Sequence, residues 1–504
     1  MVGLEAGRSG RESRTRGRGP WAWAVLVPAI AAGATWAVAA EGPSAVVLRE
    51  TFDRGTAAQV RIELSADGLF RPGLPRNEMK EGAKMPRPLA IKVRTRLIFY
   101  ERVLDLFDDP AAIKIGGSPA VASAGVAPGP TPPRGRPRKS VRHVVQAAAA
   151  ISGEVRSHTA QLRPDIPLLV AERRRGDATA TVVCPAGPLE RSELELVEVE
   201  GDPLILSEIL PDGPVAPGQS WPVGKAAVLG ISGYDTITRN ALEATLERLE
   251  VDRATIRVRG RIEGSLQGAT GAMACDGLLS FDRRLGWIDR FEINRNENRR
   301  PGPVEAGMDA KSTILVTRKV EQPPATLSDA ALARVSLEVS PRTERLVEHG
   351  PDGRSEFLHD RNWHVVGGDG KRILVLKRME GPKVVAQCNL MVEQPAGPGK
   401  HLDPKVFREE ATRALGGRSS VEFLGMGEIP GDPADGYRYK VAVQRLEGGL
   451  PVVRYYYLIA APTGEQLVVS YILAAQDVPS FGEEDVAMMK SLRWLPVNQA
   501  ALPR

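Results

Sequence analysis

The sequence has few of the residues that redox and zinc chemistry need. It holds three cysteines in 504 residues, Cys184, Cys275 and Cys388, and no C-x-x-C pair. Thioredoxin-like redox sites and zinc ribbons are marked by such pairs, so neither class has support here. Because three cysteines cannot all pair within one chain, two alternatives stay open. One is a disulfide between Cys184 and Cys275, and the other is a set of buried free thiols.

Intact catalytic motifs are also missing. Residues 230–234 (GISGY) are one residue short of G-x-S-x-G, and residues 218–226 (GQSWPVGKA) have the wrong glycine spacing for a phosphate loop. Acidic pairs such as Glu409 and Glu410 fit a solvated helix face. We therefore expect no catalytic residues, no cofactor and no enzyme activity. A hydrolase with two carboxylates far apart in sequence is the alternative.

Histidine is scarce too, and its densest group is His359 and His364 in the segment HDRNWH. In one continuous strand these two side chains point to opposite faces, so they would meet at a metal only if the chain turned between them. We expect no metal site, and packing around Trp363 instead.

A concentrated positive charge is absent from the body of the chain. The net charge is +5, but residues 1–40 carry five arginines and two glutamates, which leaves +2 for the remainder. Nucleic-acid-binding domains keep a dense basic face, so nucleic acid is excluded as a partner.

What the chain does have is an uncharged run at residues 21–40, WAWAVLVPAIAAGATWAVAA, behind the five arginines. A basic leader, an apolar segment and a small-residue exit form a secretory signal, which predicts cleavage after Ala40. Tryptophans near both ends are typical of membrane interfaces, so an uncleaved N-terminal membrane anchor is the alternative. Both place the body outside the cytoplasm, periplasmic or secreted, with membrane contact only through residues 21–40.

The body, 42% apolar and 26% charged over the whole chain, has the composition of a soluble globular protein of two or three domains. Residues 41–320 are predicted to form a β-rich domain. Alternation at 91–99 and 254–266 indicates half-buried antiparallel strands, and Gly260 and Gly264 on the inner face predict a bend. This favours a curved, half-barrel-like sheet whose concave side is filled by side chains or holds an apolar ligand. Residues 116–140 are expected to be a disordered excursion, and 321–342 an interdomain linker.

Residues 343–496 are predicted to form the second domain. Strand patterns lie at 357–366, 372–378 and 384–392, followed by a helix that Asp403 caps and Pro404 begins. Four more strands (421–429, 437–444, 452–460 and 466–474) precede a final helix, for which Ser480 and Glu483 offer a capping box. The fold class is therefore α+β, with a curved antiparallel sheet followed by an α/β sandwich with an antiparallel sheet and two main helices.

This order of three strands, helix, four strands and helix, with FLHDRNWHVV near its start and SLRW at its end, resembles the PsbP/DcrB type of α/β sandwich. The resemblance implies an extracytoplasmic or accessory binding module without catalysis. The first domain loosely resembles the curved-sheet lipoprotein carriers, which implies an apolar ligand.

Tyrosine is the one residue type with a skewed distribution. Six of the eight tyrosines lie between positions 437 and 471 on three consecutive predicted strands. Cross-strand packing under the helices is one interpretation. The other is an aromatic ligand-binding groove for a glycan or partner peptide, formed by Tyr437, Tyr439, Tyr455, Tyr457 and Tyr471. We expect an exported, non-enzymatic binding module, with an envelope protein, a glycan or an apolar ligand as partner. A carrier of a lipid in the first sheet is the alternative.

Overall fold

The computed structural model describes residues 45–72, 87–107, 134–154, 157–174, 177, 179–416, 421–431 and 436–496. Residues 1–40, with the signal or anchor and the cleavage site after Ala40, lie outside the described residues. Ala45–Arg504 form one compact unit. In the described ranges no helix has the length and apolar character needed to cross a membrane.

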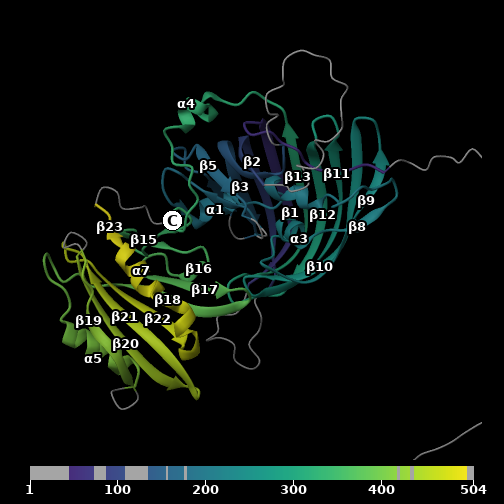
Figure 1. Cartoon of the computed structure of the whole chain (residues 1–504). Helices are drawn as coiled ribbons and strands as arrows, with labels where there is room; N and C mark the ends of the chain where they lie inside the picture. The colour runs from purple at the N-terminus through teal and green to yellow at the C-terminus, as the bar shows by residue number, and fades with distance from the viewer. Residues whose placement is uncertain are drawn as a thin grey trace, which may run out of the picture. The chain divides into compact units, whose positions relative to one another are not determined.

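The first part of the chain forms a twelve-stranded antiparallel sheet that does not close on itself, as Figure 1 shows. Its order is β6-β5-β3-β2-β1-β13-β12-β11-β10-β9-β8, with β4 paired to β3. The strands are β1 (Ala57–Arg71), β2 (Leu89–Leu106), β3 (Pro137–Gly153), β4 (Ser157–Gln161), β5 (Leu168–Glu172), β6 (Thr181–Val183), β8 (Ser220–Pro222), β9 (Thr236–Leu249), β10 (Arg253–Leu266), β11 (Ala269–Asp282), β12 (Trp287–Arg299) and β13 (Gly307–Lys319).

The close approach of β10 to β9 requires glycine at position 260, where the sequence predicts a bend. Gly260 has a φ of +153°, and a Cβ built there would lie 2.0 Å from the carbonyl oxygen of Ala241 on β9. The register between β10 and β9 also shifts twice, at Thr255/Ile256 and at Glu263/Gly264. Bulges and strand glycines increase local twist and bend a sheet, so this region of the sheet curves.

One face of the large sheet carries the main core. Side chains such as Phe99, Ile256 and Val258, all fully buried, pack with short helices against this face. The helical segments are α1 (Arg191–Val197), α2 (Pro203–Leu206), η3 (Ser207–Ile209) and α3 (Lys225–Ser232). At the sheet edge, Trp221 of β8 donates its indole N–H to the Ile209 carbonyl at 2.8 Å. The described inner face is thus lined by helices and side chains.

The expected excursion at 116–140 ends earlier than predicted. Most of it lies outside the described residues, but β3 begins at Pro137. Arg138 donates to Asp105 of β2 and Glu172 of β5, and Lys139 pairs with Glu172. Asp105 and Glu172, which are distant in sequence, thus neutralise Arg138 and Lys139, for which the sequence alone predicts a solvated loop.

The predicted linker, 321–342, docks against β2 and β3. It contains η4 (Ala325–Leu327) and α4 (Asp329–Leu332). Leu327 and Leu332 are buried against Val141, and Arg102 donates to the Leu327 carbonyl at 2.7 Å. The segment is therefore packed on the first sheet along part of its length.

A four-stranded sheet joins the two predicted domains. Its order is β23-β15-β14-β7, in which β7 (Leu189–Glu190) comes from the first domain and pairs in parallel with β14 (Leu346–His349) of the second. The other members are β15 (Ser355–His359) and β23 (Arg493–Trp494). The chain on both sides of the predicted linker therefore contributes to one sheet.

The second domain has the predicted three strands, helix and four strands in its main sheet, but β14 and β15 precede them and two short helices, not one, follow them. Its sheet, β16-β17-β18-β22-β21-β20-β19, is antiparallel throughout. The elements are β16 (Trp363–Gly368), β17 (Ile373–Glu380), β18 (Lys383–Glu393), α5 (Pro404–Ala414), β19 (Glu422–Glu428), β20 (Tyr437–Glu447), β21 (Leu450–Ala460), β22 (Gln466–Ala474), η7 (Ala475–Asp477), α6 (Val478–Phe481) and α7 (Glu484–Ser491). The Asp403 carboxylate caps α5 as predicted, accepting from the Lys405 amide at 2.7 Å.

Two local predictions in this domain are wrong. The pattern at 357–366 is two strands, because the chain turns at residues 360–362 and the Trp363 amide donates to the Asp360 carbonyl at 3.1 Å. The final helix begins at Glu484, without a side-chain cap, and Ser480 donates instead to the Asp477 carbonyl at 3.0 Å. Ser480 belongs to a separate short helix, α6, while Glu483 directly precedes α7.

Candidate functional site

Three of the five predicted ligand-binding tyrosines lie in a core on one face of the seven-stranded sheet. Tyr455, Tyr457 and Tyr471 are at most 8% exposed and pack with Phe481 and Trp363. The ring centroid of Tyr471 lies 5.9 Å from that of Tyr457 and 6.0 Å from that of Trp363, and both ring pairs have edge-on geometry. This is the cross-strand packing that aromatic pairs prefer.

A buried hydrogen bond fixes the centre of that core. The Tyr457 hydroxyl donates to the Asp485 carboxylate of α7, which also pairs with Lys440 of β20. Burial, followed by the Asp485 charge, raises the pKa of Tyr457. The phenol therefore stays protonated and acts as a donor that ties α7 to the sheet.

The other two predicted tyrosines lie on the opposite face, beside α5. The Tyr437 ring stacks on His401 with a centroid distance of 3.7 Å, and its hydroxyl donates to Glu428 at 3.1 Å. Tyr439 meets Phe407 of α5 edge-on at 6.4 Å. Both tyrosines are half-buried. The five residues thus divide between two faces and do not form one groove.

The exposed apolar surface near Tyr437 and Tyr439 is at the outer strand of the sheet. In the described part of the chain β19 pairs with β20 alone. Leu424 and Met426 on β19 are 49% and 44% exposed, and Val406 on α5 is 42% exposed. We call the exposed side chains of Leu424 and Met426 the β19 surface. Sequence reasoning predicted this strand at 421–429 and the two tyrosines beside it, but not that the strand lies at the edge, because an edge position is a property of the whole sheet.

Next to the open strand the backbone is accessible. A Cβ built on Gly425 or Gly427 would meet no heavy atom within 4 Å, so open space surrounds these two positions. Five of the seven β19 residues are exposed. An edge strand of this kind offers backbone donors and acceptors that only another extended segment can pair fully.

His359 and His364 are two neighbouring histidines whose pKa values are both strongly lowered. His359 is 3% exposed, its Nδ1 lies 2.8 Å from the Asp360 carbonyl oxygen, and its Nε2 is buried without a hydrogen-bond partner. Burial, and then the nearby Arg191 charge, lowers the pKa of each histidine to about 4. The turn between β15 and β16 brings them close enough for His359 to contribute to the His364 shift.

Among the described residues no group of three or more His, Cys, Asp or Glu side chains is placed to hold a metal ion. The two imidazoles lie near Arg191, which contacts the turn at Arg361, while Arg361 in turn contacts Glu198. We call Arg191, Glu198 and Arg361 the arginine junction.

The arginine junction links α1 of the first domain to the turn before β16. Arg191 donates to the carbonyl oxygens of Arg361 and Trp363, the latter at 2.8 Å. Arg361 in turn donates to the Glu198 carboxylate and to the Glu344 carbonyl, the latter at 2.9 Å. Burial raises the pKa of Glu198, although Arg361 opposes the shift. No sequence motif marks these residues.

The three cysteines are free and buried. Burial raises the pKa of Cys275 to about 11 and that of Cys184 and Cys388 as well. The structure thus has buried thiols, and Cys184 and Cys275 are not joined. Because the thiolate is the reactive form, these side chains are held in an unreactive state.

Comparisons with known proteins give distant structural resemblances and no family assignment. No protein-family model and no curated protein matches the chain. CyanoP, the cyanobacterial PsbP of Synechocystis sp. PCC 6803, is similar over 30% of this chain and 93% of its own, with 12% identity and a TM-score of 0.24. Lipovitellin is similar over 58% of this chain and 28% of its own, with 6% identity and a TM-score of 0.29. The immunity protein TplEi of T6SS from Pseudomonas aeruginosa covers 44% of this chain, with 11% identity and a TM-score of 0.20.

Proposed function

We propose that the protein is an exported, non-enzymatic binding module whose C-terminal sandwich takes up an extended segment of an envelope protein along β19. The observation that carries the proposal is the open edge of β19 with the exposed side chains of Leu424 and Met426. Strand addition to such an edge obtains affinity from main-chain hydrogen bonds and specificity from alternate side chains. Export rests on the signal-like residues 21–40.

Features of β19 favour a short foreign segment over a second copy of the same strand. Glu422 and Glu428 stand at its two ends, and the register shifts between Phe423 and Gly425. Charges and a bulge on an edge strand protect against edge-to-edge self-pairing. The same two carboxylates suit a partner segment whose apolar residues are flanked by lysine or arginine.

Peptide binding to the purified protein tests the proposal. Extended apolar peptides flanked by lysines are expected to bind and to slow hydrogen exchange of the β19 amides, while glutamate-flanked versions bind more weakly. The variant Leu424→Asp should weaken binding about tenfold or more, since it places a charge in an apolar contact. Leu278→Asp on β11 is the matched control, because Leu278 is 42% exposed on the other sheet.

Two results would reject the proposal. One is peptide or oligosaccharide binding that leaves the β19 amides unprotected and is unchanged in Leu424→Asp. The other is turnover of a substrate that a single Asp, Glu or His substitution abolishes, because this would make the protein an enzyme.

A further inference from the structure

A cleft of about 400 Å³ lies on the outer side of the large sheet, away from the β19 surface. Its walls come from the turn before β1, from β2 and from the docked segment around α4. The volume is near the lower end of the roughly 300–1,000 Å³ range of small-molecule sites. A site of this size suits a ligand with a short chain.

The lining of the cleft is divided by polarity. Arg54 and Arg102 supply guanidinium groups, whereas Leu104, Leu332 and Leu337 supply apolar side chains. These leucines belong to, or pack against, a small core beneath α4. A ligand that satisfies both parts has an anionic head and an apolar tail.

Each of the two guanidinium groups has a carboxylate partner that is either shared with another arginine or exposed to solvent. Asp105 accepts from Arg54 at 2.5 Å and also from Arg138 at 3.0 Å, so one carboxylate serves two arginines. Arg102 is anchored by the Leu327 carbonyl, and its ion pair with Asp329 is formed by a carboxylate that is 92% exposed. Exposed pairs of that kind contribute little free energy, so a ligand head can take the place of Asp329.

Access to Arg102 is kept open by a glycine. Gly55 has a φ of +86°, a conformation that favours glycine, and a Cβ there would lie 3.8 Å from Nη2 of Arg102. A longer side chain at this position would cover the guanidinium group.

We propose that this cleft binds a single-chain anionic amphiphile, with its head between Arg54 and Arg102 and its alkyl chain along Leu104, Leu332 and Leu337. The head could be the carboxylate of a fatty acid or the phosphate of a one-chain lipid, which share the same recognition chemistry. A planar carboxylate or a phosphate is the group that paired guanidinium donors bind best.

Titration calorimetry with octanoate and octyl phosphate, on the purified full chain, tests the site. Saturable binding of one ligand per chain is expected for at least one of them, and the tighter ligand identifies the head group. Octanol, which lacks the charge, and acetate, which lacks the tail, should each bind about tenfold or more weakly. Failure of both octanoate and octyl phosphate to saturate, or equal binding of octanol, overturns the proposal.

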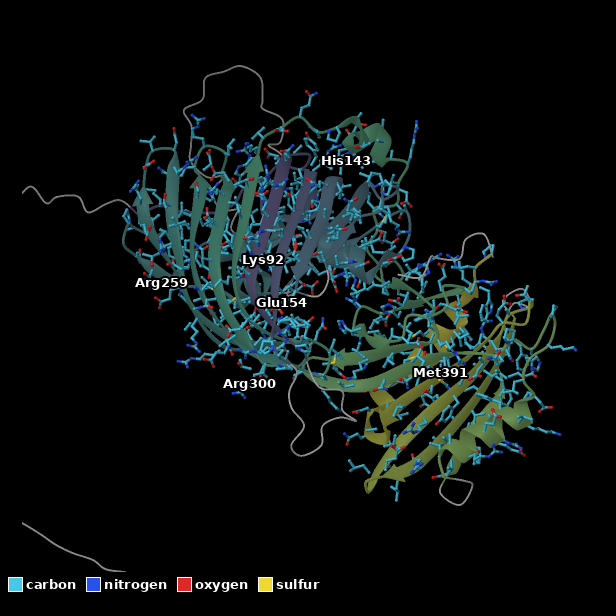
Figure 2. All side chains as sticks on the ribbon, turned by 180° about the vertical axis from the view of Figure 1, so that it is seen from behind. Lys92, His143, Glu154, Arg259, Arg300 and Met391 are labelled. Atoms are coloured by element: carbon cyan, nitrogen blue, oxygen red, sulfur yellow. The ribbon has the colours of Figure 1, made fainter. Side chains whose placement is uncertain are left out.

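Two variants, one expected to weaken binding and one expected to tighten it, test whether the ligand binds in this cleft. Arg54→Gln should weaken binding of the tighter amphiphile about tenfold, whereas Asp329→Asn should tighten it by freeing Arg102. Arg54 and Asp329 are 64% and 92% exposed, so neither change should alter the thermal unfolding of the chain. Arg259→Gln is the control, since Arg259 lies on β10 of the same sheet (Figure 2). Binding that is unchanged in Arg54→Gln, or is lost equally in Arg259→Gln, refutes the assignment.

Discussion

His359 and His364 are held neutral in the folded protein, and this has a consequence for stability. Burial and the Arg191 charge lower both pKa values to about 4, whereas an unfolded histidine titrates near 6.5. Between these values the unfolded chain binds more protons than the folded chain. The contribution of the two neutral histidines to folding stability is therefore fully present above pH 6.5 and is lost as the pH falls toward 4.

We predict that the free energy of unfolding of the protein drops between pH 7 and pH 5, by about 1–3 kcal/mol for His359. The variant His359→Asn should show a smaller drop, because the group that gains a proton on unfolding is gone. Urea unfolding at the two pH values measures the difference. His158→Asn, at an exposed site on β4, should keep the wild-type drop, and an unchanged drop in His359→Asn would contradict the prediction.

The histidine pair also shows where sequence reasoning about side chains stops. Alternation along one continuous strand accounts for the tyrosines of β21, where Tyr455 and Tyr457 lie in one core and Tyr456 lies in the core on the opposite face. The same rule kept His359 and His364 apart, because it assumed one strand where a turn occurs. Asp360 and Asn362 are ordinary turn residues, but nothing local decides that the chain turns at this point.

At the scale of single elements, the bend of β10 gives the sharpest prediction. The variant Gly260→Ala should lower the free energy of unfolding by about 3 kcal/mol or more, since its Cβ overlaps the Ala241 carbonyl and its φ of +153° is unfavourable for alanine. Gly425→Ala on β19 should change it little, because its Cβ enters open space. Urea unfolding measures both variants. Equal stability of the two would contradict the prediction, because it would show that β9 can shift away from residue 260 without loss of free energy.

Elements with local signals were predictable, and elements defined by distant partners were not. The alternation of β10 and the Asp403 and Pro404 start of α5 are present in the sequence and in the structure. The start of β3 was missed, because its basic residues are neutralised by Asp105 and Glu172 from other strands. The open edge of β19 was missed for the same reason, since strand order is set by the whole sheet.

At the scale of the whole molecule, the arginine junction is expected to stabilise the folded chain. The variant Arg361→Ala leaves Glu198, whose pKa is already raised by burial, without its cation. Removing one partner of a buried ion pair costs about 3–5 kcal/mol, and partial exposure of this pair reduces the expected loss to about 2–3 kcal/mol. Arg259→Ala is the exposed control, and unfolding by urea is the measurement. A loss no larger than that of the control would mean that the junction contributes nothing.

We expect the shared sheet to make the two predicted domains dependent on each other for stability, because β7 pairs with β14. The second domain has its own aromatic core around Tyr457 and Tyr471, so it has the means to fold. Its strands β14 and β15, however, continue onto β7, and its turn at Arg361 is held by Glu198 and Arg191. We therefore predict that residues 343–496 alone fold with a lower thermal midpoint than the same residues have in the full chain. Calorimetry of the full chain should show coupled unfolding. Two independent transitions, one of which matches the isolated fragment in midpoint, would show that β7 and the arginine junction transmit no stability between the domains.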